Sequence, residues 1–315
     1  MQHYAADEVH RLLDYPRLVE ALRVAHRDGD MPQMDVKVLS DAVRPDNKFV
    51  SLLSWAAGDV IAVKLVGVFP GNVDLAPAQP SVQGLVTLFD GRTGAPLATC
   101  DGAALTFRKT AADSALGVQC LAREDAEVLL VVGAGGLAPH VIAAHTAVRP
   151  TLRRVLIWNR NIAKAEALAS RLQAEGRHVS VAGSLDKAVA EADIISCVTM
   201  ATEPLVKGRL LKPGAHVDLI GAYLPEMREA DDQVIRRAGR LFVDTRNNAQ
   251  GSGDVAGPMA AGILQEDGIV ADLFDLCQGR HLGRDSNDQI TVFKNVGGGH
   301  LDMMTMRHLV KQASP

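Results

Sequence analysis

Apolar runs and amphipathic stretches alternate along the middle of the chain. Residues 128–132 (VLLVV) lack the alternation of a half-exposed strand, which predicts a parallel strand buried on both faces. Similar runs predict strands at 154–158, 178–182, 193–199, 216–220 and 241–244, with helices at 141–148, 162–175 and 185–192 between them. This alternation predicts an α/β domain with a doubly wound parallel sheet of the Rossmann type.

The N-terminal third has a different pattern. It predicts an amphipathic helix pair at 5–28, strands at 35–56, 61–68, 85–89 and 96–100, and a helix at 105–121. The turn DGRTG at 90–94 joins two of these strands as a hairpin, so we expect an antiparallel or mixed sheet. The tail 290–308 contains a strand, three glycines and a helix, and we expect it to return to this region. The N-terminal part and the tail together predict a second, α+β domain.

The turn after the first buried strand has the spacing of a dinucleotide-binding motif. The sequence GAGGLA at 133–138 is a G-x-G-x-x-A motif between a predicted strand and a predicted helix. Gly133 permits the tight turn, Gly135 lets the backbone approach a pyrophosphate, and Ala138 lets helix and strand pack closely. The helix N-terminus adds free N–H groups and a positive dipole end. An ordinary glycine turn is the alternative, but the strand–turn–helix–strand context favours a dinucleotide.

The end of the second strand of this unit indicates which dinucleotide is bound. NAD sites usually have an acidic residue there for the ribose 2′-hydroxyl, whereas this strand ends Trp158-Asn159-Arg160. An arginine can pair with a 2′-phosphate through a bidentate fork. NADPH is therefore the predicted cofactor, with NADH as the second possibility; the alternative for Arg160 is a solvated residue at a helix start.

Composition restricts the class of protein. The 315 residues carry a net charge of −4 without a long basic run, which argues against nucleic acid as the main partner. No apolar run reaches the roughly 18 residues that span a bilayer, and the charged N-terminus lacks the apolar core of an export signal. The cysteines are scattered, without disulfide or zinc spacing. We expect a cytoplasmic protein that acts on a small molecule, with no metal site and no membrane partner.

A lysine interrupts the apolar strand at 61–68. Lys64 would be costly there without a partner for its charge. It either faces an anion, which we favour, or extends past a sheet edge into water. Lys109 and Thr110 lie near the start of the helix predicted at 105–121, where cations are disfavoured unless an anion binds nearby. Both lysines therefore indicate an anionic ligand.

Several motifs together resemble the ornithine cyclodeaminase/mu-crystallin family along the whole chain. They are KLVGVFPGN at 64–72, FDGRTGAPLA at 89–98, KTAA at 109–112, GAG at 133–135, WNR at 158–160, VTMATEP at 198–204 and KPGAH at 212–216. Within this family the chain is most similar to bacterial reductases of Δ1-pyrroline-2-carboxylate and other cyclic ketimines, and to NADPH-binding mu-crystallins.

The resemblance implies a domain plan and a set of site residues. It places an NAD(P)-binding Rossmann domain at 113–292, and a substrate-binding and dimerisation domain at 1–112 with 293–315, in a homodimer. It implies that Lys64 and Lys109 contact the carboxylate of an imino- or amino-acid substrate. The residues it implies for the cofactor are Thr110, Gly133, Gly135, Gly136, Leu137, Asn159, Arg160, Thr199, Met200 and Ile220, with Asn295 near the nicotinamide.

Several positions depart from the family pattern, among them Gly251, where some relatives have a glutamate before Ser-Gly-Asp. Lys109 stands where the family usually has arginine, so the bidentate grip on a carboxylate is lost unless Arg108 or another cation replaces it. A second substrate arginine has no clear match, and Lys37 is the nearest cation. Tyr223 stands where cyclodeaminases and some amino-acid dehydrogenases of the family have an aspartate, so the general base of the ammonia chemistry is missing.

These features predict NADPH-dependent reduction of Δ1-pyrroline-2-carboxylate, Δ1-piperideine-2-carboxylate or both, giving L-proline or L-pipecolate. The alternatives are an ornithine or lysine cyclodeaminase, an open-chain amino-acid dehydrogenase, and a non-catalytic NADPH-dependent binding protein. His300, after three glycines, could be an acid/base or a structural helix-cap residue, whereas His140 and His145 are expected to be packing or surface residues.

Overall fold

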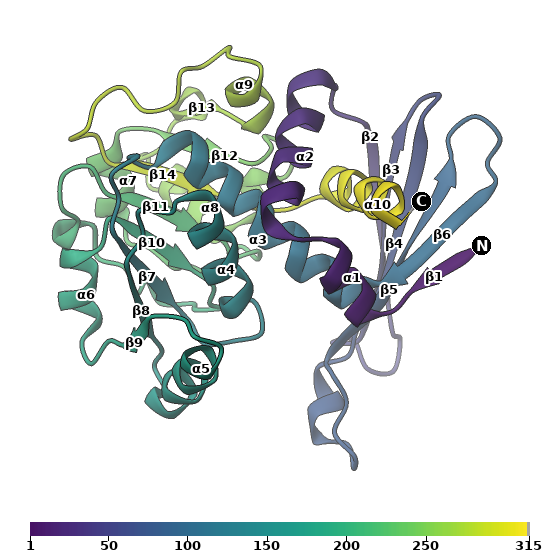
Figure 1. Cartoon of the computed structure of the whole chain (residues 1–315), viewed down its shortest axis with the longest axis horizontal. Helices are drawn as coiled ribbons and strands as arrows, with labels where there is room; N and C mark the ends of the chain where they lie inside the picture. Colours follow the sequence, from purple (N-terminus) through teal and green to yellow (C-terminus); the bar gives the residue numbers. More distant parts are fainter. Residues whose placement is uncertain (314–315) are drawn as a thin grey trace. The chain divides into compact units, whose positions relative to one another are not determined.

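The computed structural model describes residues 1–313, which form two compact units (Figure 1). The first unit consists of Met1–Thr110 and the C-terminal segment from Gly298, and the second consists of Ala111–Gly297. The boundary near residue 110 falls within one long helix, α3 (Gly102–Leu121). The second boundary lies five residues later than the 292/293 expected from the sequence, because residues up to Lys294 belong to a strand of the second unit.

The first unit contains a six-stranded mixed sheet in the order β1-β6-β5-β4-β3-β2. Strands β2 to β6 pair with one another in antiparallel fashion, and β1 is parallel to β6, so the predicted antiparallel or mixed sheet is a mixed one. The strands are β1 (Gln2–Tyr4), β2 (Gln33–Ser40), β3 (Lys48–Ala56), β4 (Val60–Val68), β5 (Val82–Asp90) and β6 (Pro96–Asp101). The helices are α1 (Ala6–Leu12), α2 (Tyr15–Asp28), the 3-10 helix η1 (Pro70–Asp74) and α10 (Gly299–Ala313).

Strand alternation gives this sheet two different faces. Helix α10 packs against β3, β4 and β5, so the tail does return to the first unit (Figure 1). Side chains such as Ala62 and Val86 are buried on the α10 side. The opposite face, here called the outer face, is mostly apolar, although Asp35, Lys37, Ser51 and Thr87 also lie on it. None of its apolar members is fully buried; these are Leu39, Phe49, Leu53, Trp55, Ile61, Val63, Leu65, Leu85, Phe89 and Leu97.

The second unit is an eight-stranded parallel sheet in the order β13-β12-β14-β11-β10-β7-β8-β9. The strands are β7 (Val128–Val132), β8 (Arg154–Trp158), β9 (Val179–Val181), β10 (Ile194–Cys197), β11 (His216–Leu219), β12 (Leu241–Val243), β13 (Ile269–Ala271) and β14 (Thr291–Lys294). The helices are α4 (Ala138–Val148), α5 (Ile162–Ala174), α6 (Leu185–Glu191), α7 (Asp232–Ala238), α8 (Gly253–Ala260) and α9 (Leu273–Cys277), with 3-10 helices η2 (Gly208–Leu210), η3 (Ala249–Gly251) and η4 (Glu266–Gly268).

This strand order confirms the Rossmann prediction. The part of the sheet in the order β9-β8-β7-β10-β11 has the arrangement of the first five strands of a dinucleotide-binding sheet. The chain builds β7, β8 and β9 toward one edge, then crosses back to place β10 and β11 on the other side of β7. Residues 129–132 of β7 are completely buried, as the uninterrupted apolar run predicts. Strand β13 was not predicted; it is three residues long, too short for a periodic signal.

The start of α3 is the main correction to the predicted elements. The sequence places this start near residue 105, but the helix begins at Gly102 because the Asp101 carboxylate accepts a hydrogen bond from the backbone N–H of Ala104 at 2.7 Å. Lys109 therefore lies about two turns inside the helix rather than beside its free N–H groups. Among the described helices, none is both long and apolar enough to cross a bilayer.

Candidate active site

Lys64 lies on β4, inside the sheet of the first unit. Its strand is paired on both sides, by β3 and β5, so extension past a sheet edge is the wrong interpretation. The side chain instead points to the buried α10 side of the sheet, where Nζ donates to Thr106 Oγ1 at 2.6 Å. The Nζ atom also lies 3.6 Å from Asp302 Oδ1. The strand lysine therefore has an acidic partner from the far end of the chain.

Lys109, on α3, points to the same carboxylate. Its Nζ lies 2.7 Å from Asp302 Oδ1 and donates to the carbonyl of Gly298 at 3.2 Å. The sequence predicts an anion near Lys109, and the structure contains one within the protein itself. Both lysines are at least nine-tenths buried, so neither charge is stabilised mainly by water.

Asp302, on α10, is the residue of this cluster that the sequence analysis missed. It is fully buried and stands between the buried residues Leu301 and Met303. An acid within an apolar helical stretch was the available signal, but sequence alone cannot say which cation it meets. Two ammonium groups and one carboxylate leave this cluster, Lys64–Lys109–Asp302, with a net positive charge when all three are ionised.

Burial controls the ionisation of Lys64. Desolvation lowers its pKa from 10.5 to about 8, with the Lys109 charge acting in the same direction and the Asp302 charge opposing both. The side chain is thus mostly an ammonium group at neutral pH but gives up its proton more easily than a solvated lysine. Such a group can both bind a carboxylate and donate a proton.

The two other cations considered for this site lie elsewhere. Arg108 Nε is 3.1 Å from His10 Nδ1, and the guanidinium group stacks over the Tyr15 ring at 4.6 Å. Lys37 is exposed on β2 and pairs with Asp35 at 3.4 Å. Lys109 stands where the family usually has an arginine, and Arg108 does not take over the position of that arginine.

In the second unit, the glycine turn has the local geometry that a dinucleotide requires. Gly133 has φ of 119°, and a Cβ there would lie 2.9 Å from Val198 Cγ2, so only glycine is suited to this turn. Gly135 is exposed, and a Cβ on it would meet no described atom within 4 Å. No side chain of the described chain caps α4, which begins at Ala138. Open backbone next to an uncapped helix N-terminus suits a pyrophosphate group.

All of the remaining predicted cofactor residues except Thr110 lie at or near the carboxyl ends of the parallel strands. Thr199 and Met200 follow β10, Ile220 follows β11, and Asn295 follows β14, where its Nδ2 donates to Ser114 Oγ at 3.1 Å. This is the edge at which ligands of doubly wound sheets bind. Gly136 and Leu137 lie in the glycine turn, Asn159 and Arg160 follow β8, and Thr110 is the last residue of the first unit on α3.

Two of the histidines considered in the sequence, His300 and His145, are buried. His300 is completely buried in the first turn of α10, with its ring edge-to-face with His26 at a centroid distance of 6.0 Å. Burial lowers the pKa of His300 well below 6.5, so the ring is neutral, which supports the structural interpretation. His145 is not a surface residue: it is buried, and its Nε2 lies 3.2 Å from Asp218 Oδ2.

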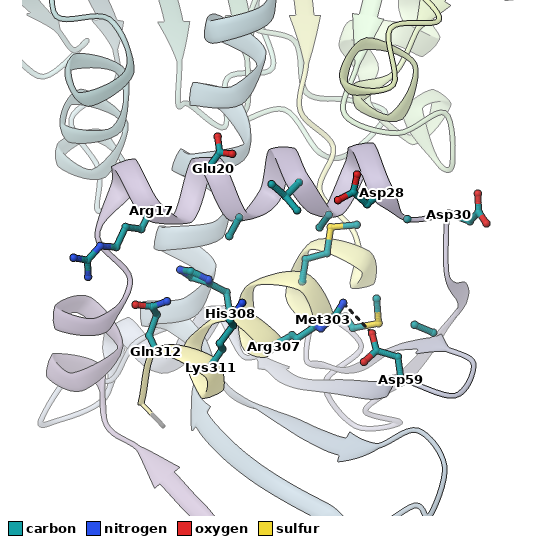
Figure 2. Close-up of a pocket in the computed structure, with 16 residues that line it drawn as sticks. Arg17, Glu20, Asp28, Asp30, Asp59, Met303, Arg307, His308, Lys311 and Gln312 are labelled. Atoms are coloured by element: carbon teal, nitrogen blue, oxygen red, sulfur yellow. Dashed lines mark ion pairs between the residues drawn. The ribbon is translucent and has the colours of Figure 1, made fainter. Parts of the chain in front are cut away.

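A separate groove in the first unit lies between α2 and α10 (Figure 2). Its volume is about 670 Å³, and none of the predicted site residues lines it. Cations and acids are mixed along it, and two of its lining residues form an ion pair, with Arg307 Nη1 2.9 Å from Asp59 Oδ2 (Figure 2). A lining of mixed charge does not select an anionic substrate, so the lysine cluster remains the candidate site.

Known proteins are similar to this chain across both units. The model of the ornithine cyclodeaminase/mu-crystallin family matches residues 5–314. Protein SAR DEFICIENT 4 of Arabidopsis thaliana is 43% identical over 80% of this chain and 79% of its own length. A Δ1-pyrroline-2-carboxylate reductase of Paracoccus denitrificans is 39% identical over 95% of this chain and 93% of its own length.

A solved structure has the same architecture. The Δ1-pyrroline-2-carboxylate reductase of Thermococcus litoralis, in complex with NADH and L-proline, superposes with a TM-score of 0.91. The two chains are 27% identical, and the match covers 99% of this chain and 97% of the other.

Proposed function

Because the chain belongs to the ornithine cyclodeaminase/mu-crystallin family, we propose that it reduces a cyclic ketimine carboxylate with a nicotinamide cofactor. The substrates proposed are Δ1-pyrroline-2-carboxylate, Δ1-piperideine-2-carboxylate or both, and the products L-proline and L-pipecolate. The imine oxidoreductase class is that of relatives which match nearly the whole chain. The observation that carries the proposal is the Lys64–Lys109–Asp302 cluster, whose positive charge complements one carboxylate.

Lys64 and Lys109 would bind the substrate carboxylate and so fix the orientation of the imine. An ammonium group has three N–H donors, and that of Lys64 donates one to Thr106 Oγ1 and faces Asp302 Oδ1 at 3.6 Å. The carboxylate and the imine nitrogen are attached to the same carbon of the substrate, so a Lys64 ammonium group that binds the carboxylate would also lie near the nitrogen. Fixing the imine in one orientation is the main contribution that such residues make to the rate.

The bonds and charges of the proposed step balance. The C=N bond gains a hydride at carbon and a proton at nitrogen, which gives the secondary amine of the product. A nicotinamide cofactor held at the turn 133–138 would supply the hydride and would itself be oxidised. We assign the proton to Lys64, since a pKa of about 8 makes its ammonium a competent acid near neutral pH. Solvent then returns the proton to Lys64.

For the cofactor we propose NADPH in preference to NADH. Arg160 is exposed directly after β8, and it forms no ion pair with any residue of the described chain. A free guanidinium at this point of the fold suits a ribose 2′-phosphate. Replacing Arg160 by alanine should raise the Kd of NADPH about tenfold or more and leave that of NADH unchanged. Equal effects on both cofactors would contradict the assignment.

We also propose a homodimer formed through the outer face of the first unit. Leu39 and Trp55 on this face are 67% and 48% exposed, although the pattern of the strands is that of a covered face. A second copy of the same face would remove these side chains from water, and a two-fold axis pairs a surface with itself. We also propose a cytoplasmic location, since the four cysteines are scattered along the sequence without disulfide or zinc spacing.

NADPH oxidation, followed by absorbance, tests the function. We expect turnover with Δ1-pyrroline-2-carboxylate, and the six-membered analogue and NADH in parallel measure the two preferences. Lys109→Ala should raise KM about tenfold or more, whereas Lys37→Ala, which removes an exposed cation of the same unit, should not.

Three outcomes would favour the other functions. Ammonia release from ornithine or lysine would indicate a cyclodeaminase, a function that Tyr223 argues against because it supplies no carboxylate. Turnover of pyruvate with ammonia, but of no cyclic imine, would indicate an open-chain dehydrogenase. Tight NADPH binding without turnover on any of these substrates would indicate a binding protein.

A further inference from the structure

Glu229 joins the ends of two neighbouring strands in the second unit. It is completely buried, and its Oε1 accepts hydrogen bonds from the backbone N–H and the hydroxyl of Thr199, at 2.6 and 2.8 Å. Its Oε2 accepts from the N–H groups of Gly221 and Ala222, at 2.8 and 3.3 Å. Thr199 follows β10 and Gly221 follows β11, so one carboxylate holds the loops after two adjacent strands.

These two loops are packed against each other and against the glycine turn. A Cβ on Gly221 would lie 1.9 Å from the carbonyl oxygen of Thr199, so the two backbones touch. A Cβ on Gly133 would lie 3.0 Å from the carbonyl oxygen of Val198. A shift of the loop at 198–200 would therefore disturb both the turn after β7 and the loop after β11.

Glu229 is in turn held by a second buried acid. Its backbone N–H donates to Asp254 Oδ1 at 2.8 Å, and Asp254 Oδ2 lies 3.4 Å from Nζ of the buried Lys294. Donors and a nearby cation of this kind are what a buried carboxylate requires. No motif in the sequence points to Glu229, because its partners come from separate segments of the chain.

We propose that Glu229 is a positioning residue for the nicotinamide cofactor. Its carboxylate holds the loops after β10 and β11 in the conformation that receives the dinucleotide, so cofactor affinity depends on it. The inference rests on the proposed function, because it takes the turn at 133–138 as the dinucleotide site. Glu229 itself need not touch the cofactor.

Ionisation of Glu229 gives the proposal a second consequence. Burial raises the pKa of Glu229 to about 7; the Asp254 charge adds to this effect, and the Lys294 charge and the hydrogen bonds from Thr199 oppose it. Once protonated, one carboxyl oxygen becomes a donor and faces a group that also donates. Affinity for the cofactor should therefore fall as pH falls from 8 to 6. The titratable groups around this carboxylate are Lys294, Asp254 and Cys197.

The test measures the Kd of NADPH by fluorescence titration for the wild type, Glu229→Gln and Glu191→Gln. The glutamine amide would direct its N–H groups at Thr199 or at Gly221, which are donors themselves, so Kd should rise about tenfold or more. Glu191, an exposed glutamate of the same unit that pairs with Arg154, should give the wild-type Kd when replaced. Both variants are first compared with the wild type by circular dichroism.

A pH series with NADH, which has no 2′-phosphate to titrate, completes the test. We expect the wild-type Kd to rise severalfold from pH 8 to pH 6 and the Glu229→Gln value to change much less. If the glutamine variant does not fold, the wild-type series decides: a flat profile overturns the inference. An unchanged Kd in a folded Glu229→Gln protein overturns it as well. Failure of the wild type to bind either cofactor would overturn the proposed function together with this inference.

Discussion

Removing the carboxylate of Asp302 should change the pH range in which the protein works. Asp302 Oδ1 lies 3.6 Å from Lys64 Nζ and 2.7 Å from Lys109 Nζ. The substitution Asp302→Asn keeps the shape of the side chain but leaves the two buried ammonium groups without their common counter-ion. Since the wild-type pKa of Lys64 is already lowered to about 8, the loss of an attractive charge must lower it further.

The size of this effect follows from the distance between the charges. Two unit charges at 3.6 Å attract each other by about 1 kcal/mol at the dielectric constant of water. At the effective dielectric constant of a protein site, roughly 20, the attraction is about 5 kcal/mol. Because about 1.4 kcal/mol corresponds to one pH unit, the pKa of Lys64 should fall by about one to three pH units. Lys64 would then be largely neutral at pH 7.5.

The assay is the pH profile of kcat/KM with Δ1-pyrroline-2-carboxylate, which reports groups of the free enzyme. In the wild type we expect kcat/KM to fall as pH rises through about 8, because Lys64 loses the proton that it needs as donor and as carboxylate ligand. In Asp302→Asn the same decline should begin about one to three pH units lower. Titration of the substrate is common to both proteins and cancels in the comparison.

The control is Asp59→Asn, which breaks the partly exposed ion pair with Arg307, a residue of α10 like Asp302. It should leave the profile unchanged and cost at most about 1 kcal/mol of unfolding free energy. Asp302→Asn should cost about 3 kcal/mol or more, since it breaks a buried pair. If the decline occurs at the same pH in the wild type and in Asp302→Asn, Asp302 does not set the charge of Lys64 and the reasoning is refuted.

Three further predictions address other parts of the molecule. Gly135→Ala should leave the thermal midpoint unchanged, since nothing lies within 4 Å of the added methyl, but should weaken NADPH binding about tenfold; unchanged binding would contradict a close pyrophosphate. Trp55→Glu on the outer face should convert a dimer to monomers in sedimentation velocity, and an unaltered mass would exclude this face as the interface. Burial lowers the pKa of His216 from 6.5 to about 3, so the unfolded chain takes up a proton below pH 6.5 while the native ring does not, and stability is lost as pH falls. The free energy of unfolding of His216→Gln, measured with urea, should therefore fall by about 2 kcal/mol less than that of the wild type between pH 6.5 and pH 5. Equal decreases in the two proteins would contradict the lowered pKa of His216.

Much of the fold follows from the sequence because its signals are local. The buried run at 128–132, the glycines at 133 and 135, and the spacing of the later strands each lie within one short segment, and a parallel sheet imposes them wherever it occurs. The family motifs likewise identify Lys64 and Lys109 one by one. The sequence thus predicted the two kinds of sheet, the dinucleotide turn and the return of the tail.

Only the tertiary structure decided which charges meet. Asp302 lies almost 200 residues from Lys109 in the chain and reaches it because α10 packs against the sheet that carries Lys64. Glu229 reaches Thr199 and Gly221 in the same way, through the ends of two parallel strands. A lone charge in an apolar segment signals that a partner exists, since burying it otherwise costs too much. The identity of that partner depends on packing between distant segments, and no local pattern of residues encodes it.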